Sequence, residues 1–197
     1  MSARAKPGER KLQILQTIAE MLQQPQADKI TTASLAAAIN ISEAALYRQF
    51  SSKAQMFEGL IAFIEQSLFG LINKISTEES AGLAQLEKII AMLLGFAQKN
   101  PGLTRVLVGD ALTNEDERLK VRMNQLHERL EASLRQCLRI AQTQQETAPG
   151  IDINAQANFI LCFVIGRWQQ YTKSGFRRNP LEYWAAQWKL ILTSCVG

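Results

Sequence analysis

A set of polar side chains between residues 42 and 53 has the chemistry needed to bind a nucleic acid. Hydroxyl, amide and ammonium groups donate hydrogen bonds to phosphate oxygens, and an arginine also reads the edge of a guanine base. A small alanine lets a helix approach a base closely or touch a thymine methyl group. The set consists of Ser42, Glu43, Ala44, Tyr47, Arg48, Gln49, Ser52 and Lys53. We predict that these residues contact double-stranded DNA, together with Thr31 and Thr32 ahead of them.

Two short helices joined by a turn are needed to position this set. Residues 33–39 and residues 43–50 each have one apolar side. The apolar residues are Leu35, Ala36 and Ile39 in the first helix, and Ala45, Leu46 and Phe50 in the second. Asn40 in the turn tolerates the left-handed backbone that a sharp corner requires. Ser42 is a suitable N-cap for the second helix, and Thr31 or Thr32 is suitable for the first.

This arrangement predicts a helix-turn-helix whose second helix enters the DNA major groove. A helical hairpin inside a bundle has similar geometry, and the exposed polar set favours the DNA-binding interpretation. The next helix begins near Lys53, and the free N–H groups and positive dipole of its first turn also favour a phosphate. For Glu43 two roles stay open: its carboxylate accepts a hydrogen bond from cytosine, or it stays in solvent and stabilises the helix dipole.

The segment around these helices resembles the DNA-binding head of TetR-type regulators, whose pattern is roughly T-x-x-x-L-A-x-x-x-x-V-S-x-x-x-L-Y-x-H-F-x-x-K. The matching positions are Thr32, Leu35, Ala36, Ile41, Ser42, Leu46, Tyr47, Phe50 and Lys53. Gln49 stands where the family usually has histidine, and its amide can still donate to a phosphate. The resemblance implies an N-terminal DNA-binding head and a larger helical domain that forms dimers.

The composition is that of a folded chain. It has 197 residues, of which 47% are apolar, which allows a sizeable core and argues against general disorder. The net charge of +4 suits a polyanionic partner without requiring one. No apolar run reaches the roughly 18 to 20 residues of a membrane span, and the polar start lacks the core of a secretory signal. The cysteines, which fall on apolar helix faces, indicate buried thiols of a cytoplasmic protein: Cys137, Cys162 and Cys195.

Helical periodicity continues over the rest of the chain, so we predict an all-α protein with a helix-turn-helix head and a larger helical bundle. A helix at residues 9–24, ended by Pro25, should brace the head. Further helices are expected at residues 52–75, 83–100, 103–112, 114–142, 155–168 and 180–196. The helix at 52–75 has an apolar side made of Phe57, Leu60, Ile61, Ile64, Leu68, Leu71, Ile72 and Ile75. We place the arm and head at residues 1–52 and the dimerisation and partner domain at residues 53–197.

The last two helices have more apolar surface than one core can bury. Residues 155–168 are apolar on almost every side, and residues 180–196 have a clear apolar stripe. A second copy of the chain is the simplest partner for this surplus, through a four-helix interface between two subunits. The predicted contacts are Phe159, Phe163, Trp184, Trp188 and Ile191. A twofold pair would present two recognition helices to a palindromic DNA site.

Three further segments, at residues 63–73, 93–112 and 122–139, resemble the nucleoid occlusion factors within the TetR family. With the head, this resemblance covers most of the first 140 residues. It implies a dimer that binds palindromic chromosomal sites, is not released by a ligand, and contacts the C-terminal tail of the tubulin-like division GTPase FtsZ. The positions that match the contact surface are Phe63, Gly95, Lys99 and Asn100. Leu71 stands where the family has an arginine.

The residues alone leave two interpretations of Phe63. It lies off the main apolar stripe of its helix, so it is either an exposed anchor for a short peptide or covered by another helix.

An enzyme is not indicated. The single histidine, His127, falls in a charged repeat where a solvated helix face is expected, and no carboxylate or glycine pattern is typical of a catalytic or phosphate-binding motif. We expect no cofactor and no metal. Two other functions stay open: a ligand-responsive repressor that binds a small molecule inside its helical domain, and a helical adaptor that does not bind DNA. The apolar residues expected in the core suit an apolar ligand and a filled core equally.

Overall fold

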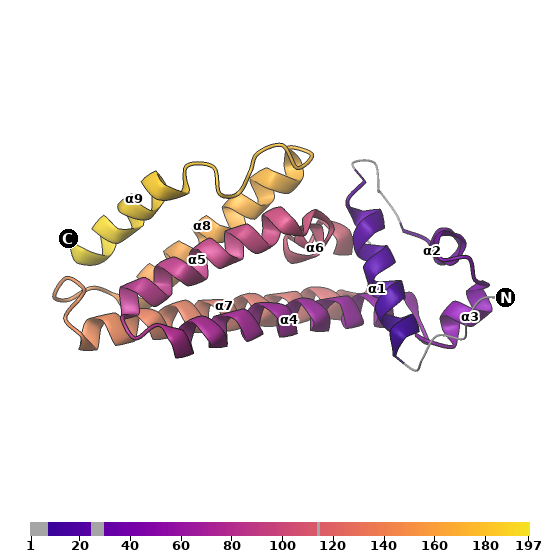
Figure 1. Cartoon of the computed structure of the whole chain (residues 1–197), viewed down its shortest axis with the longest axis horizontal. Helices are drawn as coiled ribbons and strands as arrows, with labels where there is room; N and C mark the ends of the chain where they lie inside the picture. Colours follow the sequence, from indigo (N-terminus) through magenta and orange to yellow (C-terminus); the bar gives the residue numbers. More distant parts are fainter. Residues whose placement is uncertain (1–7, 25–29, 114) are drawn as a thin grey trace. The chain divides into compact units, whose positions relative to one another are not determined.

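The computed structural model describes residues 8–24, 30–113 and 115–197, which form helices and contain no strand (Figure 1). The helices are α1 (Glu9–Leu22), α2 (Thr32–Ala38), α3 (Glu43–Tyr47), α4 (Lys53–Glu78), α5 (Gly82–Lys99), α6 (Pro101–Leu107), the short 3₁₀ helix η1 (Asp110–Leu112), α7 (Glu117–Thr143), α8 (Ile153–Lys173) and α9 (Trp184–Val196). The all-α prediction is confirmed. The N-terminal arm and Pro25, expected to end the first helix, lie outside the described residues.

The chain divides into two compact units. The first consists of Met1–Ile64 and Asn100–Arg122, and the second of Glu65–Lys99 and Met123–Gly197. Both α4 and α7 therefore contribute to each unit, whereas the sequence suggested a boundary after residue 52. In addition to the helix-turn-helix, the first unit contains the beginning of α4 and all of α6.

The first unit is built on the contact between α1 and α6. One face of α1 is buried through Ile14, Ile18 and Leu22, and the backbone of α1 meets α6 at Gly102. A Cβ atom at Gly102 would lie 1.9 Å from the carbonyl oxygen of Ala19, so this crossing has no room for a side chain. Glycine is therefore required here by the close approach of two backbones.

Along α4, one apolar stripe is buried from Met56 to Ile72. It consists of Met56, Phe57, Leu60, Ile61, Ile64, Leu68 and Ile72. The prediction that Leu71 also belongs to the core is wrong, because 42% of its side chain is exposed. Leu71 projects in nearly the same direction as Leu60, about three turns earlier. This side of α4 is buried at Leu60, which belongs to the first unit, and exposed to solvent at Leu71, which belongs to the second.

In the second unit, α8 is held against α5 by hydrogen bonds from two large side chains. The indole Nε1–H of Trp168 donates to the carbonyl oxygen of Leu93 at 3.2 Å, and the Tyr171 hydroxyl donates to the carbonyl oxygen of Gln98 at 3.2 Å. Trp168 is completely buried. Because each ring buries its apolar body and satisfies its polar atom, these contacts fix α8 along the C-terminal half of α5.

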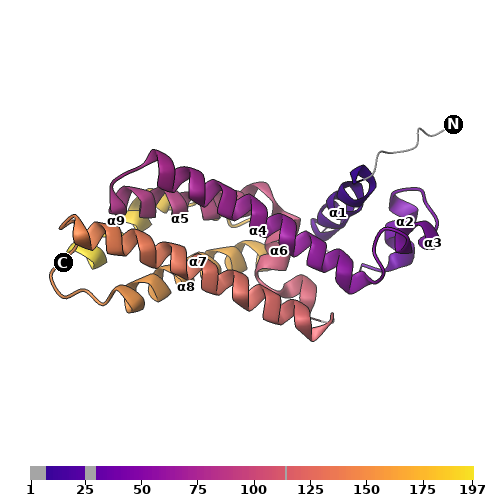
Figure 2. The same ribbon diagram turned by 90° about the horizontal axis from the view of Figure 1, so that it is seen from below.

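An ion pair joins the second-unit part of α4 to α7, which lies beside it (Figure 2). The Arg129 Nη1 donates to the Glu65 carboxylate at 3.2 Å, and the Glu65 side chain is only 11% exposed. The Arg129 guanidinium also lies 4.0 Å from the centroid of the Phe69 ring, a cation–π contact.

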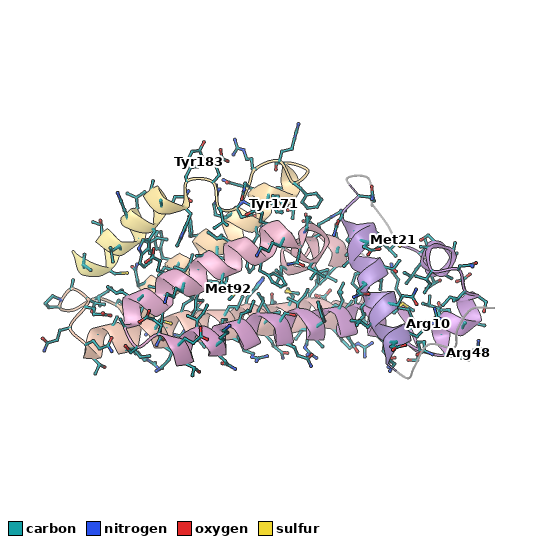
Figure 3. The ribbon with its side chains drawn as sticks, viewed as in Figure 1. Arg10, Met21, Arg48, Met92, Tyr171 and Tyr183 are labelled. Atoms are coloured by element: carbon teal, nitrogen blue, oxygen red, sulfur yellow. The ribbon has the colours of Figure 1, made fainter. Side chains whose placement is uncertain are left out.

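A buried arginine determines the path between α8 and α9. Arg167 donates from its guanidinium to three backbone carbonyl oxygens of that connection: Asn179 at 2.8 Å, Glu182 at 3.0 Å and Pro180 at 3.2 Å. These bonds hold the segment that leads into α9, which begins directly after the exposed Tyr183 (Figure 3).

Two side chains occupy environments that differ from those expected. The ring of His127 is half-buried and its centroid lies 6.4 Å from that of Trp168, because α8 covers this side of α7. Cys137 and Cys195 are buried as predicted, and burial raises the pKa of the Cys137 thiol to about 11. Cys162 is exposed, because it lies on the solvent side of α8 one turn after the exposed Phe159.

The crossing at Gly102 can be tested by a single methyl group. We expect Gly102→Ala to lower the free energy of unfolding by about 1–3 kcal/mol or more, because the added carbon would overlap the backbone of Ala19. Gly70→Ala is the matched control: Gly70 lies within α4 with no atom within 4 Å of its would-be Cβ, so the change should stabilise by about 0.5–1 kcal/mol. Urea unfolding measures both. Equal stabilities of the two variants would contradict the close crossing.

Candidate nucleic-acid interface

The helix-turn-helix has the expected turn. Asn40 has a φ of 53°, in the left-handed region predicted for it. The N–H of Ile41 donates back to the carbonyl oxygen of Ala36 at 3.0 Å, which closes the corner between α2 and α3. Leu35 and Leu46 bury the inner sides of the two helices.

Side-chain caps begin α2 and α3, as the sequence indicated. The Thr31 hydroxyl accepts from the N–H of Ser34 at 3.0 Å, and the Ser34 hydroxyl accepts from the N–H of Thr31 at 3.1 Å, a reciprocal capping box for α2. The Ser42 hydroxyl accepts from the N–H of Ala45 at 3.2 Å and caps α3. Ser52 caps the start of α4 in the same way, accepting from the N–H of Gln55 at 3.1 Å.

The second helix is shorter than predicted. It ends at Tyr47, and the N–H of Gln49 donates to the carbonyl oxygen of Leu46 at 2.9 Å, a tight bond that closes the last turn. Arg48 and Gln49 therefore follow the helix instead of forming its last turn; Figure 3 shows the side chain of Arg48 at this end of α3. Phe50 is buried as expected.

All ten predicted DNA contacts lie in the first unit. The exposed ones are Thr31, Ser42, Glu43, Ala44, Tyr47 and Arg48, and the half-buried ones are Thr32, Gln49, Ser52 and Lys53. The Tyr47 side chain is 45% exposed. The structure thus leaves both ends of α3 accessible to a partner: its first turn, and Tyr47 and Arg48 at its end.

The hydroxyl groups differ in what they can still donate. A hydroxyl has one hydrogen, and that of Thr32 is donated to the Glu43 carboxylate at 2.6 Å, while that of Thr31 is donated to the Ser34 hydroxyl at 3.0 Å. In their capping bonds Ser42 and Ser52 only accept, so each keeps a hydrogen for a phosphate oxygen. Glu43 has a role that sequence reasoning missed, since it joins the start of α3 to the start of α2.

Lys53, the predicted phosphate contact at the start of α4, is paired with a carboxylate of its own chain. Its ammonium group donates to Glu115, and the two side chains are only 23% and 14% exposed. The same ammonium lies 5.6 Å from the centroid of the Phe57 ring. Sequence reasoning missed Glu115, which follows η1 and is far from Lys53 along the chain, so no local pattern connects the two residues.

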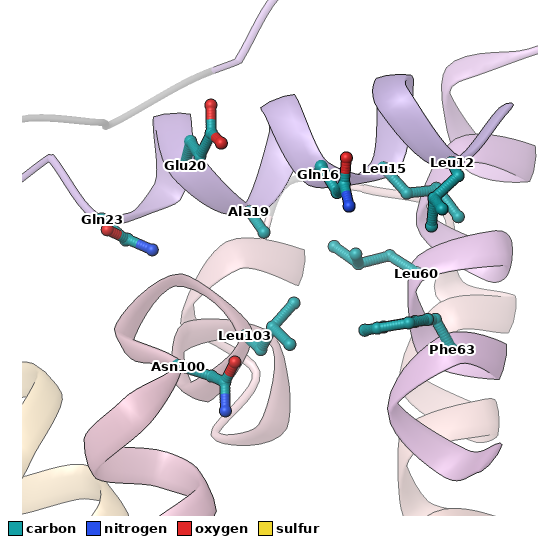
Figure 4. A pocket seen from close by; sticks show the side chains of 10 residues that line it. All are labelled: Leu12, Leu15, Gln16, Ala19, Glu20, Gln23, Leu60, Phe63, Asn100 and Leu103. Carbon is teal, nitrogen blue, oxygen red and sulfur yellow. The ribbon is translucent and has the colours of Figure 1, made fainter. Parts of the chain in front are cut away.

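A pocket of about 300 Å³ lies in the first unit between α1, α4 and α6 (Figure 4). It is lined by Leu12, Leu15, Gln16, Ala19, Glu20, Gln23, Leu60, Phe63, Asn100 and Leu103. Phe63, which is 40% exposed, points from α4 into this pocket toward Leu103 of α6, and Asn100 also lines the pocket. Gly95 and the exposed Lys99, the other predicted partner contacts, belong to α5 in the second unit.

The predicted dimer residues have different environments. Phe159 is 53% exposed, and Phe163 and Trp184 are half-buried. Trp188 and Ile191 are buried in the core of their own chain, because the apolar stripe of α9 faces α5 and α8. On the other side of α9, Leu190 is 72% exposed, and sequence reasoning did not single it out.

The described residues contain no group of side chains arranged to hold a metal ion. Within these same ranges, no helix has the length and apolar character needed to cross a membrane.

A capped helix-turn-helix at the start of an all-α chain, followed by a larger helical domain, defines a TetR-type DNA-binding regulator. The model of bacterial regulatory proteins of the tetR family matches residues 14–60. A TetR regulator from Haloarcula marismortui has the same fold, with a TM-score of 0.80 at 15% identity over 96% of this chain and 99% of that one. So does the Bacillus subtilis regulator FadR solved with stearoyl-CoA, with a TM-score of 0.77 at 13% identity over 93% and 98%.

The chain belongs to the family of the nucleoid occlusion factor SlmA. The SlmA-like model of a tetracyclin repressor-like C-terminal domain matches residues 80–195. SlmA of Marinomonas sp. strain MWYL1 is 46% identical over 94% of both chains. SlmA of Vibrio cholerae is 48% identical over 89% of this chain and 92% of the relative. The similarity therefore extends beyond the first 140 residues, and the family consists of DNA-binding regulators and not of enzymes.

Proposed function

We propose that this protein is a nucleoid occlusion factor that binds palindromic DNA as a homodimer and restrains assembly of the division GTPase FtsZ over the chromosome. It acts in the cytoplasm, associated with the nucleoid. The observation that carries the proposal is the similarity to SlmA along nearly the whole chain, combined with a helix-turn-helix whose two helices both have side-chain caps.

The accessible groups of the head divide between phosphate and base contacts. Tyr47 donates its hydroxyl to a phosphate, and the hydroxyls of Ser42 and Ser52 do so while they cap their helices. Lys53 supplies a positive charge to the backbone, and Gln49 an amide. Ala44, near the start of α3, and Arg48, directly after its end, are both exposed, and these two residues read bases.

The DNA contacts can be tested by removing single groups from the head. Tyr47→Phe should weaken binding to cognate and scrambled duplexes by a similar factor, about 0.5–1.5 kcal/mol, because it removes only a phosphate donor. Arg48→Ala should change site preference, because Arg48 is assigned to a base edge and not to a phosphate. Fluorescence anisotropy with a palindrome selected from a random pool measures both. Thr32→Val is the matched control, with the smallest effect, because its hydroxyl hydrogen is donated to Glu43. A loss for Thr32→Val as large as for Tyr47→Phe would contradict this division.

The dimer is proposed to form through α8 and α9. Support comes from the apolar side chains that these helices leave exposed, chiefly Phe159 on α8 and Leu190 on α9. Phe163 on α8 and Trp184 on α9 are half-buried. A monomer rarely exposes contiguous apolar surface without a partner for it. Trp188 and Ile191 are proposed to support the interface from within the subunit, since both are buried in its core.

A double charge substitution tests this interface. Phe159→Glu with Leu190→Glu should convert the dimer to a folded monomer, because two carboxylates cannot be buried without partners. Sedimentation equilibrium gives the mass, and circular dichroism checks the fold. Trp188→Glu should instead unfold the subunit, since Trp188 is buried within it. If the double variant stays an ordinary dimer, the interface lies elsewhere.

The FtsZ contact is proposed to involve Phe63, Gly95, Lys99 and Asn100. In the first unit, support comes from the open pocket lined by the apolar Phe63 and the polar Asn100, which suits an apolar residue of an extended peptide. In the second unit, support comes from Lys99, whose exposed charge suits an acidic residue of a partner. Leu71 replaces the family arginine with an exposed apolar side chain on α4.

Substitution of Phe63 and Lys99 should separate partner binding from DNA binding. Phe63→Ala with Lys99→Glu should leave operator affinity unchanged and weaken binding of a synthetic FtsZ tail peptide at least about tenfold, or about 1.4 kcal/mol. Val121→Ala, at an exposed apolar position of α7, is the control and should change neither. Leu71→Arg, which restores the family residue, should strengthen peptide binding.

The same assay tests the alternative. A ligand-responsive repressor would show no peptide binding and would release its DNA when a small apolar effector is added. Wild-type protein that is saturated with its own DNA site and has no affinity for the FtsZ tail would overturn the proposed function.

A further inference from the structure

We propose that Glu115 regulates DNA affinity by competing with the DNA backbone for the ammonium group of Lys53. This inference rests on the proposed phosphate contact of Lys53. It adds a residue outside the helix-turn-helix, on the segment between η1 and α7, that sets how strongly the head binds DNA.

The geometry of Lys53 favours competition over sharing. Lys53 is the first residue of α4, and its backbone lies beside the Ser52 cap, where the positive end of the helix attracts a phosphate. Its side chain instead reaches toward the second turn of α4, where its ammonium lies 5.6 Å from the Phe57 ring and bonds to Glu115. The charge is thus directed away from the end of the helix that receives the DNA backbone.

The pairing is shielded from solvent. With 23% and 14% of their side chains exposed, Lys53 and Glu115 are screened less by water and salt than a surface pair. A phosphate that recruits Lys53 must therefore displace a neutralising carboxylate, and part of its attraction is lost to that exchange.

Neighbouring charges leave Glu115 committed to Lys53. Asp116, the next residue, is held by Arg118, which donates from its backbone N–H at 3.0 Å and from Nε and Nη2 of its guanidinium at 3.1 Å and 2.8 Å. Glu117 bonds to Lys120 at 2.8 Å. Each of the three consecutive carboxylates thus forms an ion pair with a different basic side chain. Glu115 is the one that pairs with Lys53 at the start of α4.

The experiment compares Glu115→Gln with a variant that removes the same charge two residues away. We expect Glu115→Gln to raise affinity for a palindromic duplex selected from a random pool, and for a scrambled duplex, by about fivefold. The salt slope should become steeper by about 0.9, because Lys53 now replaces a counterion of the DNA. Glu117→Gln, whose carboxylate pairs with Lys120, should give a smaller rise and no change in slope.

A Lys53→Gln background shows whether the gain acts through Lys53. There Glu115→Gln should raise affinity no more than Glu117→Gln does. Glu115→Asp, which keeps the charge but shortens the side chain, should give an intermediate gain and covers the case in which Glu115→Gln does not fold.

The outcomes separate the two proposals. If Lys53→Gln alone leaves DNA affinity unchanged, the proposed phosphate contact of Lys53 fails. If Lys53→Gln weakens binding but Glu115→Gln lowers affinity or matches Glu117→Gln, only the competition is overturned. A gain that persists in the Lys53→Gln background also overturns it.

Discussion

The arrangement of the DNA-binding helices depends on one contact, the crossing of α1 over α6 at Gly102. A carbonyl oxygen of α1 occupies the space where a side chain of α6 would begin, so the two backbones lie in direct contact there. The helix-turn-helix packs through Leu35 and Leu46, and α1 carries the same buried core on its inner face. The head is therefore not a separate three-helix module. It is part of a unit that includes α6 and the beginning of α4.

Internal acceptors moderate the basic character of this head. A net positive chain gains DNA affinity from every cation and hydroxyl it exposes. Here the Thr32 hydrogen is donated to Glu43 and the Lys53 ammonium is paired with Glu115. Both groups match the TetR pattern, yet each has a partner in its own chain. If DNA recruits either group, it must first displace this internal partner, so the net gain is smaller than the full strength of a new contact.

Buried polar contacts decide which apolar side chains of the second unit remain outside. Trp168 and Tyr171 fix α8 on α5, and Arg167 fixes the connection to α9. With the two helices held in this way, Phe159 and Leu190 cannot turn inward. Solved regulators that are only 13% and 15% identical have the same fold, which indicates that helix pattern and packing, more than particular residues, specify the bundle.

The sequence by itself determined the helices, their caps and the family. Periodicity, a left-handed Asn40 and the caps at Thr31 and Ser42 depend on neighbours within one or two turns, so they can be predicted from local pattern. Only the tertiary structure decided that Lys53 bonds to Glu115 and that Trp188 faces its own core while Leu190 faces solvent. These outcomes depend on which helix covers which side of another. The packing of the helices is determined by contacts between residues far apart in the chain, so the spacing of neighbouring residues cannot predict it.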